Sequence, residues 1–295
     1  MRFLAKRYNE KGVALESDGR SEEAIVCYEK AIKSDSGWSV PWYNLGLLYK
    51  RRNLWERSLA CNQRAAELNP EDEAAWWNLG IAATALENWV EARRAWQAYG
   101  IEIESGEGPI EMDFGATPIR LNPDGDGEVV WCCRIDPARA IIESVPLPES
   151  NHRYQDLLLH DGAPNGYRKL GSREVPVFDE LQLLKPSEFG TFEVLIDGVT
   201  PDLLDKLIDS EVEKAGDDLA IEDWRTIRRL CRACSEGRPF DQTHTHEQDT
   251  GSERRVGIAA KSEKRVRELI AAWREKLPEA TFSEINCALP PAWVN

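Results

Sequence analysis

Along the first third of the chain, small and large apolar residues recur among polar ones in a pattern that repeats every 34 residues. The repeat aligns Gly12 with Gly46 and Gly80. An aromatic residue lies four positions before each glycine and a small residue twelve positions after it; these residues are Tyr8, Trp42, Trp76, Ala24, Ser58 and Ala92. Within each repeat the apolar residues have helical spacing, so the pattern predicts three pairs of antiparallel helices joined by short polar turns.

The residue types at these positions have a packing reason. Only a small residue lets two helix axes approach closely, and a neighbouring aromatic side chain fills the space that remains. A single helix pair cannot bury both of its apolar faces, so we expect the pairs to stack into an array. The blocks at 42–49 (WYNLGLLY) and 76–83 (WWNLGIAA) are near copies of each other. On these residues the chain resembles the tetratricopeptide repeat (TPR) family over residues 5–104.

Some positions depart from the family's pattern. The second copy has Asn62 where an aromatic residue is usual. The first copy has Tyr8 and Lys11 where the other two have tryptophan and leucine. We therefore expect the helices to pack more loosely at those positions.

The resemblance implies a curved array whose concave face is lined by the first helix of each pair. Carried over position by position, the expected partner-binding residues are Asn9, Val13, Tyr43, Asn44, Leu47, Trp77, Asn78 and Ile81. Relatives that grip a terminal carboxylate project Lys or Arg into this groove, whereas the matching positions here are Asn9, Val13 and Ala74. We therefore expect an apolar groove that holds a peptide or helix of a protein partner, and no clamp for a chaperone tail.

From residue 109 the pattern changes to short segments rich in β-branched and aromatic residues. Turn signals such as Asp161-Gly162 and Asn165-Gly166 separate these segments. They predict an antiparallel sheet or small barrel within 105–196. In 197–295 we expect helices from Thr200 to about Lys214, from about Glu222 to Ser235, and from Ser262 to about Leu277, with strands at 255–260 and 281–289.

The predicted fold class is therefore mixed α and α/β. A three-repeat TPR α-solenoid occupies 1–104, and a C-terminal β-rich and α+β region follows. The order of strands and helices in 197–295 predicts helices on one face of a mixed sheet. This segment is either a domain of its own or part of one domain with 105–196.

Composition and charge exclude some classes of function. Of 295 residues, 42% are hydrophobic and 30% charged, which is ordinary for a folded protein of about two domains. The net charge is −15, of which −13 falls in 105–295, and this acidity argues against a nucleic-acid partner. No apolar run reaches the roughly 18 residues of a bilayer span, and the first residues lack the apolar core of a signal peptide. We expect a cytoplasmic protein, without a membrane partner, whose seven cysteines are reduced.

One group of residues has the composition of a zinc site. Cys231 and Cys234 are three positions apart, and His244 and His246 follow within a dozen residues. Zinc takes four such ligands in a tetrahedron, so zinc is the one cofactor that the sequence suggests, in a structural role. The alternative is that the cysteines are small core residues of a helix and the histidines belong to a loop. A redox role is disfavoured because the pair lies near the predicted end of a helix.

Evidence for catalysis is weak. The sequence contains no GxSxG, HExxH, GxxxxGK or GxGxxG motif. His152 and His160, with Asp156 and Asp161, could form an acid–base pair, but histidines beside a turn are commonly structural. Whether the chain is an enzyme stays open, and the residues favour a protein without catalytic activity.

These observations predict an intracellular adaptor whose TPR groove binds a segment of a partner protein. Two alternatives stay open. The first is an immunity-type neutraliser, in which the acidic C-terminal half covers the basic active site of a toxin or nuclease. The second is an enzyme or zinc-containing module in 105–295 that the repeats direct to its target.

Overall fold

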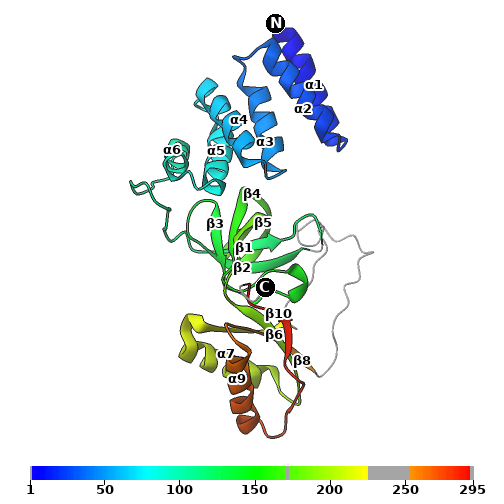
Figure 1. The fold of residues 1–295 in the computed structure, drawn as a ribbon, viewed down its shortest axis with the longest axis vertical. Helices are drawn as coiled ribbons and strands as arrows, with labels where there is room; N and C mark the ends of the chain where they lie inside the picture. The colour runs from blue at the N-terminus through cyan, green and yellow to red at the C-terminus, as the bar shows by residue number, and fades with distance from the viewer. Residues whose placement is uncertain (1, 126, 171–172, 225–252, 293–295) are drawn as a thin grey trace. The chain divides into compact units, whose positions relative to one another are not determined.

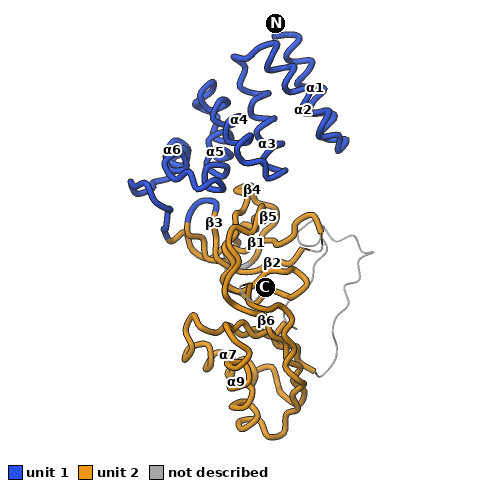
Figure 2. Tube along the Cα trace, viewed as in Figure 1, with its two compact units in different colours: residues 1–112, 136–138 blue, residues 113–135, 139–295 orange. Residues whose placement is uncertain are grey.

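The computed structural model describes residues 2–125, 127–170, 173–224 and 253–292. The chain divides into two compact units (Figure 2). The helical unit comprises residues 1–112 with 136–138, and the β-rich unit comprises 113–135 with 139–295. In the part of the chain that the structure describes, no helix combines the length and apolar character needed to cross a membrane.

The helical unit contains six helices in three antiparallel pairs (Figure 1). Their bounds are α1 (Arg2–Ser17), α2 (Ser21–Ser34), α3 (Ser39–Lys50), α4 (Trp55–Leu68), α5 (Glu73–Ala85) and α6 (Trp89–Tyr99). Consecutive pairs contact each other through α2 with α3 and α4 with α5. The predicted array of three stacked helix pairs is confirmed.

The turn inside each helix pair contains one residue in the left-handed backbone region. These residues are Gly19, Asn53 and Glu87, with φ angles of 74°, 54° and 54°. They are 34 positions apart, so the three repeats use the same turn. Glycine and asparagine tolerate this conformation well, whereas glutamate at the third position adopts it at a cost.

The expectation of loose packing at Asn62 is wrong. Asn62 is fully buried, and a Cβ atom on Gly46 would lie only 2.7 Å from its side-chain nitrogen. Its amide group donates to the Ser58 carbonyl at 2.9 Å, and the Ser58 hydroxyl donates to the Gly46 carbonyl at 2.9 Å. The bond from Ser58 to Gly46 thus joins α4 to α3, at the place where the other repeats use an aromatic ring.

The β-rich unit begins with a closed barrel of five strands, within the range where the sequence predicts a sheet or small barrel. The strands are β1 (Ala116–Leu121), β2 (Glu128–Arg134), β3 (Arg139–Ile142), β4 (Leu157–Leu170) and β5 (Arg173–Lys185). Neighbours pair antiparallel, except that β1 and β5 close the barrel in parallel. Alternate residues such as Ile119, Val130 and Leu158 form its apolar core.

A second layer of the β-rich unit combines a sheet with two helices. Its described elements are β6 (Gly190–Asp197), α7 (Pro201–Ala215), β7 (Leu219–Asp223), β8 (Arg254–Ala260), α9 (Glu263–Lys276), β9 (Thr281–Phe282) and β10 (Asn286–Leu289). The strand order is β10-β6-β8-β7 with antiparallel neighbours, and α7 and α9 cover one face (Figure 1). This is the split β-α-β topology of ferredoxin-like folds.

The helix expected to begin at Glu222 does not begin there. Glu222 and Asp223 are the last residues of β7, where their backbone pairs with β8. The pairing is favoured because Leu219 and Ile221 pack in the core between the sheet and its two helices, while Ala220 packs in a separate apolar cluster. The rest of this predicted helix, from 225 on, lies outside the described residues.

A cluster of apolar side chains joins the barrel to the helix-backed sheet. We call it the seam cluster; its residues are Val145, Leu147, Tyr154, Phe189, Ala220, Trp224 and Ala259. The Trp224 indole N–H donates to the Val145 carbonyl at 2.8 Å, and the Val145 N–H donates to the Glu222 carboxylate at 2.8 Å. Barrel and sheet are therefore connected by apolar packing and by hydrogen bonds.

Candidate functional site

The candidate site is the face formed by the first helix of each pair, α1, α3 and α5. Five of the eight predicted binding residues keep accessible surface on these helices: Val13, Tyr43, Asn44, Leu47 and Trp77. Val13 is 46% exposed, which is high for a branched apolar side chain in a folded domain. Val40 on α3, a residue that the sequence analysis did not single out, is 39% exposed. Accessible apolar residues thus lie on the first helices of the first and second repeats.

Three of the predicted residues are not accessible. Asn9, Asn78 and Ile81 are 7%, 4% and 0% exposed. Asn78 and Ile81 are on α5, where apolar residues occur on every side and nine of thirteen residues are buried. A helix that is apolar all round is enclosed by its surroundings. The expectation that these three side chains are open to a partner is wrong.

Asn9 is buried because it bonds to the next repeat. Its side-chain oxygen accepts a hydrogen bond of 3.0 Å from the Asn44 amide on α3. One hydrogen bond therefore joins the two asparagines across the boundary between the first two repeats. This bond fixes α1 against α3 and occupies polar groups that a partner would otherwise meet.

The third repeat presents an aromatic group. The ring of Trp77 meets Trp96 and Tyr99 edge to face, with centroid distances of 5.1 Å and 4.7 Å. Its indole nitrogen is buried without a hydrogen-bond partner. The Trp77 ring is thus held in one orientation by α6, and part of its surface stays accessible.

A cation at the end of α3 is already paired. The Arg51 guanidinium forms an ion pair with Glu16 at the end of α1. Glu16 also accepts a hydrogen bond of 2.8 Å from the Tyr28 hydroxyl, and burial together with this carboxylate raises the pKa of Tyr28 well above its usual value. Arg51 is therefore engaged within the array rather than free to bind an acidic ligand.

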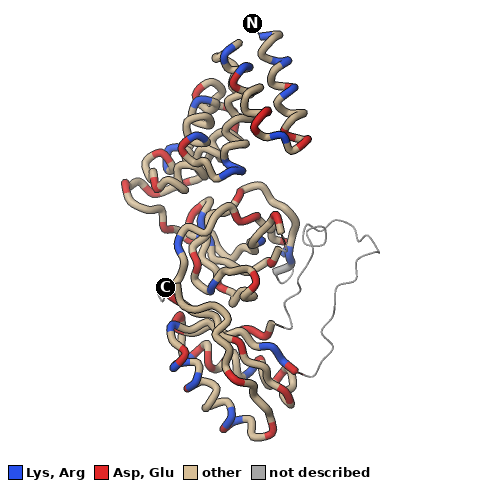
Figure 3. The backbone as a smooth tube through the Cα atoms, turned by 45° about the vertical axis from the view of Figure 1, so that its right-hand side comes forward, with Lys and Arg blue, Asp and Glu red and all other residues tan. Residues whose placement is uncertain are grey.

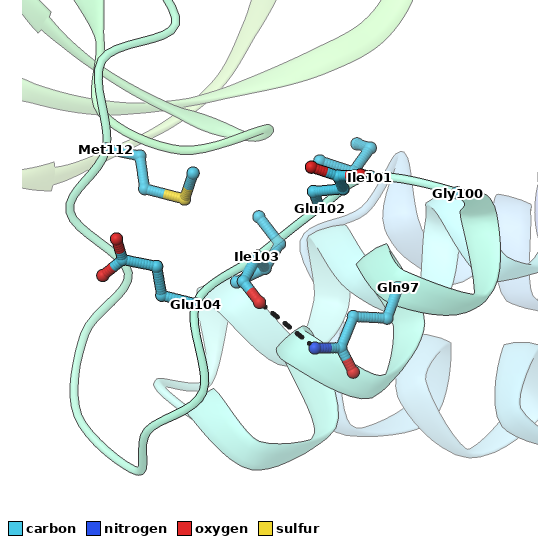
Figure 4. Close-up of a pocket in the computed structure, with 7 residues that line it drawn as sticks. All are labelled: Gln97, Gly100, Ile101, Glu102, Ile103, Glu104 and Met112. Carbon is cyan, nitrogen blue, oxygen red and sulfur yellow. Dashed lines mark hydrogen bonds between the residues drawn. The ribbon is translucent and has the colours of Figure 1, made fainter.

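An open cleft of about 630 Å³ lies where the chain leaves α6 (Figure 4). Its lining residues are Gln97, Gly100, Ile101, Glu102, Ile103, Glu104 and Met112. The segment that forms it is fixed by Arg93, which donates hydrogen bonds to the carbonyl oxygens of Glu104, Gly108 and Pro109. Sequence reasoning missed this cleft, because the arginine that shapes it acts on backbone atoms and leaves no motif.

Comparison with known families identifies the helical unit. Residues 5–37 and residues 43–106 each match a family model described as tetratricopeptide repeat. The helical unit is a TPR domain. The matches cover about a third of the chain. Repeats of this type stack into extended concave binding surfaces, so the chain carries a domain of the protein-interaction type.

Two solved structures are similar to the TPR domain. The second TPR of Spaghetti (RPAP3) bound to the HSP90 peptide SRMEEVD is 23% identical, with a TM-score of 0.31 over 32% of this chain and 89% of that one. The first TPR of Spaghetti (RPAP3) bound to the same peptide is 26% identical, with a TM-score of 0.32 over 34% and 79%. No curated protein matches this chain.

Outside the TPR domain, the two predicted histidines have different surroundings. His160 is fully buried, its Nδ1 lies 2.8 Å from the Asp161 carbonyl, and burial lowers its pKa to about 4. His152 lies 2.7 Å from Glu180. Asp156 accepts hydrogen bonds from the backbone N–H groups of Arg153 and Ser187. These contacts hold loops and strands together, and the acid–base pair stays a prediction.

The candidate zinc ligands Cys231, Cys234, His244 and His246 lie in 225–252, outside the described residues, so the zinc site stays a prediction. Within the residues that are described, no group of three or more His, Cys, Asp or Glu side chains is placed to hold a metal ion.

The acidic residues of the β-rich unit are interspersed with basic ones (Figure 3). Several are paired internally: Asp179 with Arg120, Asp223 with Arg254, and Glu193 with Arg255. Arg120 is only 1% exposed, so its pair with Asp179 is largely closed to an outside partner. The charge available to an outside partner is therefore smaller than the count of carboxylates suggests, and the neutralising role stays a prediction.

Proposed function

We propose that the TPR domain binds an apolar segment of a partner protein along α1 and α3. The observation that carries this proposal is the exposure of Val13 and Val40, with partly exposed Tyr43 and Leu47, on neighbouring first helices. Exposed apolar side chains grouped on one face of a soluble protein mark an interaction surface. Trp77 extends the surface to the third repeat with a ring that is already fixed, which lowers the entropy cost of binding.

The polar groups around this surface favour an apolar ligand over an acidic one. A ligand that ends in a carboxylate requires cationic or amide groups free to bind it. Here Asn9 and Asn44 bond to each other, and Arg51 is paired with Glu16. Binding an acidic tail would break these contacts, whereas an apolar segment leaves them intact.

The proposal is tested by comparing two valines of equal exposure. Val13 on α1 and Val26 on α2 are each 46% exposed, but only Val13 belongs to a first helix. In the full-length protein, a photo-reactive residue at position 13 should crosslink to a partner protein, and the same residue at position 26 should not. Equal crosslinking from both positions would contradict the proposed surface.

A double substitution then measures the energetics with the captured partner. Val13→Ser with Leu47→Ser should weaken binding by about tenfold or more, because two apolar contacts are lost. The matched control, Val26→Ser with Val90→Ser, alters exposed valines on second helices and should leave the affinity unchanged. Circular dichroism of both variants shows whether the repeats stay folded. Equal losses in the two variants would refute a binding role for the first helices.

A further inference from the structure

The loop between β3 and β4, residues 143–156, contains a histidine with an oxygen acceptor at each ring nitrogen. His152 is 6% exposed; its Nε2 lies 2.7 Å from Glu180 Oε1 and its Nδ1 lies 2.8 Å from the Ser150 carbonyl oxygen. An ionised carboxylate and a carbonyl both accept hydrogen bonds and donate none. The ring satisfies both neighbours only when each nitrogen carries a proton. The geometry therefore favours the charged imidazolium form.

The two acceptors belong to a closed ring of hydrogen bonds. The Asn122 N–H, in the turn after β1, donates to Glu180 Oε2 at 3.1 Å. The Asn122 side-chain amide donates to the Ser150 carbonyl at 2.9 Å, beside the bond from His152. His152 thus joins three parts of the barrel: its own loop, β5, and the turn between β1 and β2.

The same loop carries part of the connection to the helix-backed sheet. Leu147 and Tyr154 belong to the seam cluster, and Tyr154 meets Phe189 edge to face with centroids 5.0 Å apart. The Arg153 guanidinium donates to the Pro290 carbonyl beyond β10 at 3.0 Å. Movement of this loop would therefore alter the contact between barrel and sheet.

The charged groups acting on the His152 ring are acidic. Burial of the ring opposes protonation and is the largest single effect. The hydrogen bond and charge of Glu180 on β5, the Ser150 carbonyl and Asp156 of the same loop together outweigh it and raise the pKa of His152 above its usual value of 6.5. The contribution of such a group to folding is fully present below about pH 6.5 and is lost as the pH rises through its folded pKa.

We propose that His152 is a pH-operated latch, whose doubly protonated ring ties residues 143–156 to β5 and whose deprotonation releases this loop and loosens the seam cluster. Loss of the proton from either nitrogen places a lone pair against an oxygen less than 3 Å away. One of the two hydrogen bonds is then replaced by repulsion. Because the pKa of His152 is raised above 6.5, the latch opens as the pH rises above that value.

Hydrogen exchange of the full-length protein, measured from about pH 6 to about pH 9 and corrected for intrinsic rates, tests the latch. Protection of residues 143–156 should fall several-fold as His152 loses its proton, then reach a plateau.

Glu180→Gln keeps an acceptor oxygen but removes the charge, so the fall in protection should move to lower pH. His152→Gln should abolish the pH dependence. Glu174→Gln, an exposed site on the same strand, is the matched control and should behave as the native protein. Protection in the native loop that does not vary with pH would overturn the proposal.

The protonation state is measured separately on the native chain, so the test does not depend on the stability of any variant. Imidazole nitrogen resonances should show both nitrogens of His152 protonated below about pH 6.5, with a titration midpoint above 6.5. A ring with one bare nitrogen below about pH 6.5 would show that the two acceptors do not hold it doubly protonated, and would overturn the latch.

Discussion

Gly80 on α5 lies directly against the indole ring of Trp96 on α6. A Cβ atom at Gly80 would lie 2.5 Å from the outer edge of this ring, closer than real Cβ contacts allow. The same relationship holds between Gly12 and Tyr28, where the distance would be 2.6 Å. In both pairs the absence of a side chain on the first helix makes room for the aromatic ring of the second. The aromatic ring in turn fills the interior of the repeat.

The first prediction concerns this contact. Gly80→Ala should lower the free energy of unfolding of the TPR domain by about 1–3 kcal/mol, because Trp96 is fully buried and cannot move away without strain. The higher helix propensity of alanine, worth up to about 1 kcal/mol, offsets only part of this loss. Gly37→Ala is the control, since its nearest neighbouring atom would be 3.7 Å away. Urea unfolding measures both variants, and an unchanged midpoint for Gly80→Ala would contradict the packing argument.

The second prediction concerns the turn between α5 and α6. Glu87→Gly should raise the free energy of unfolding by up to about 1 kcal/mol, because Glu87 has a φ of 54° and glycine adopts this conformation without strain. The equivalent position of the first repeat is already a glycine, Gly19. Glu29→Gly, at an exposed site inside α2, is the matched control and should lower the stability by about 1 kcal/mol. Thermal unfolding of the two variants shows whether each one stabilises or destabilises the protein. Destabilisation by both substitutions would count against strain at Glu87.

A third prediction concerns the carboxyl group of Glu222 beside the seam cluster. Burial raises its pKa to about 6, in spite of the hydrogen bond from the Val145 N–H. Because the folded pKa lies above the unfolded value, the stability linked to the neutral form is present below about pH 4.5 and is lost as the pH rises through about 6. Glu222→Gln should therefore stabilise the protein at about pH 8 by roughly 1–2 kcal/mol.

The pH dependence provides the control for that prediction. Near pH 4.5 the native carboxyl is neutral, so the Glu222→Gln variant should differ little from the native protein there. Unfolding by urea at the two pH values measures the difference. An equal effect of the substitution at both values would show that packing, rather than ionisation, distinguishes the side chains.

The fourth prediction concerns the candidate zinc ligands. Elemental analysis of the purified protein should find about one zinc per chain, and Cys231→Ser should remove it, because a structural zinc requires all of its ligands. Cys287→Ser, which replaces an exposed cysteine of β10, should retain the metal. A native protein with almost no zinc would leave Cys231 and Cys234 as ordinary helix or loop residues.

The array was predictable because its information is local and repeated. Gly12, Gly46 and Gly80 recur at a constant interval, and the interval specifies both helices of a repeat and the turn between them. The repeat period does not specify the surroundings of each copy. Ile81 and Val13 occupy equivalent positions, yet Ile81 is fully buried and Val13 is 46% exposed. Burial depends on everything that surrounds a residue, so equivalent positions need not be equally accessible.

In the β-rich unit, alternating apolar residues predicted strands and turn signals predicted their separation. Strand order was not predictable, since closing β1 onto β5 joins Ile119 to Phe178 across a long stretch of chain. Long-range pairing also explains Glu222. The sequence pattern predicted a helix there, but in the structure Glu222 pairs with β8 near the end of β7. Pairing with β8 satisfies its backbone groups, and such tertiary pairing overrides a weak local preference.

The amino-acid sequence by itself determined the repeat, its turns and the kinds of element that follow, because helical and strand periodicities are properties of neighbouring residues. Only the tertiary structure decided which of these residues are accessible, how the strands are ordered and that His152 meets Glu180. These features arise from contacts between segments distant along the chain, whose strength depends on burial and on hydrogen-bond geometry in three dimensions.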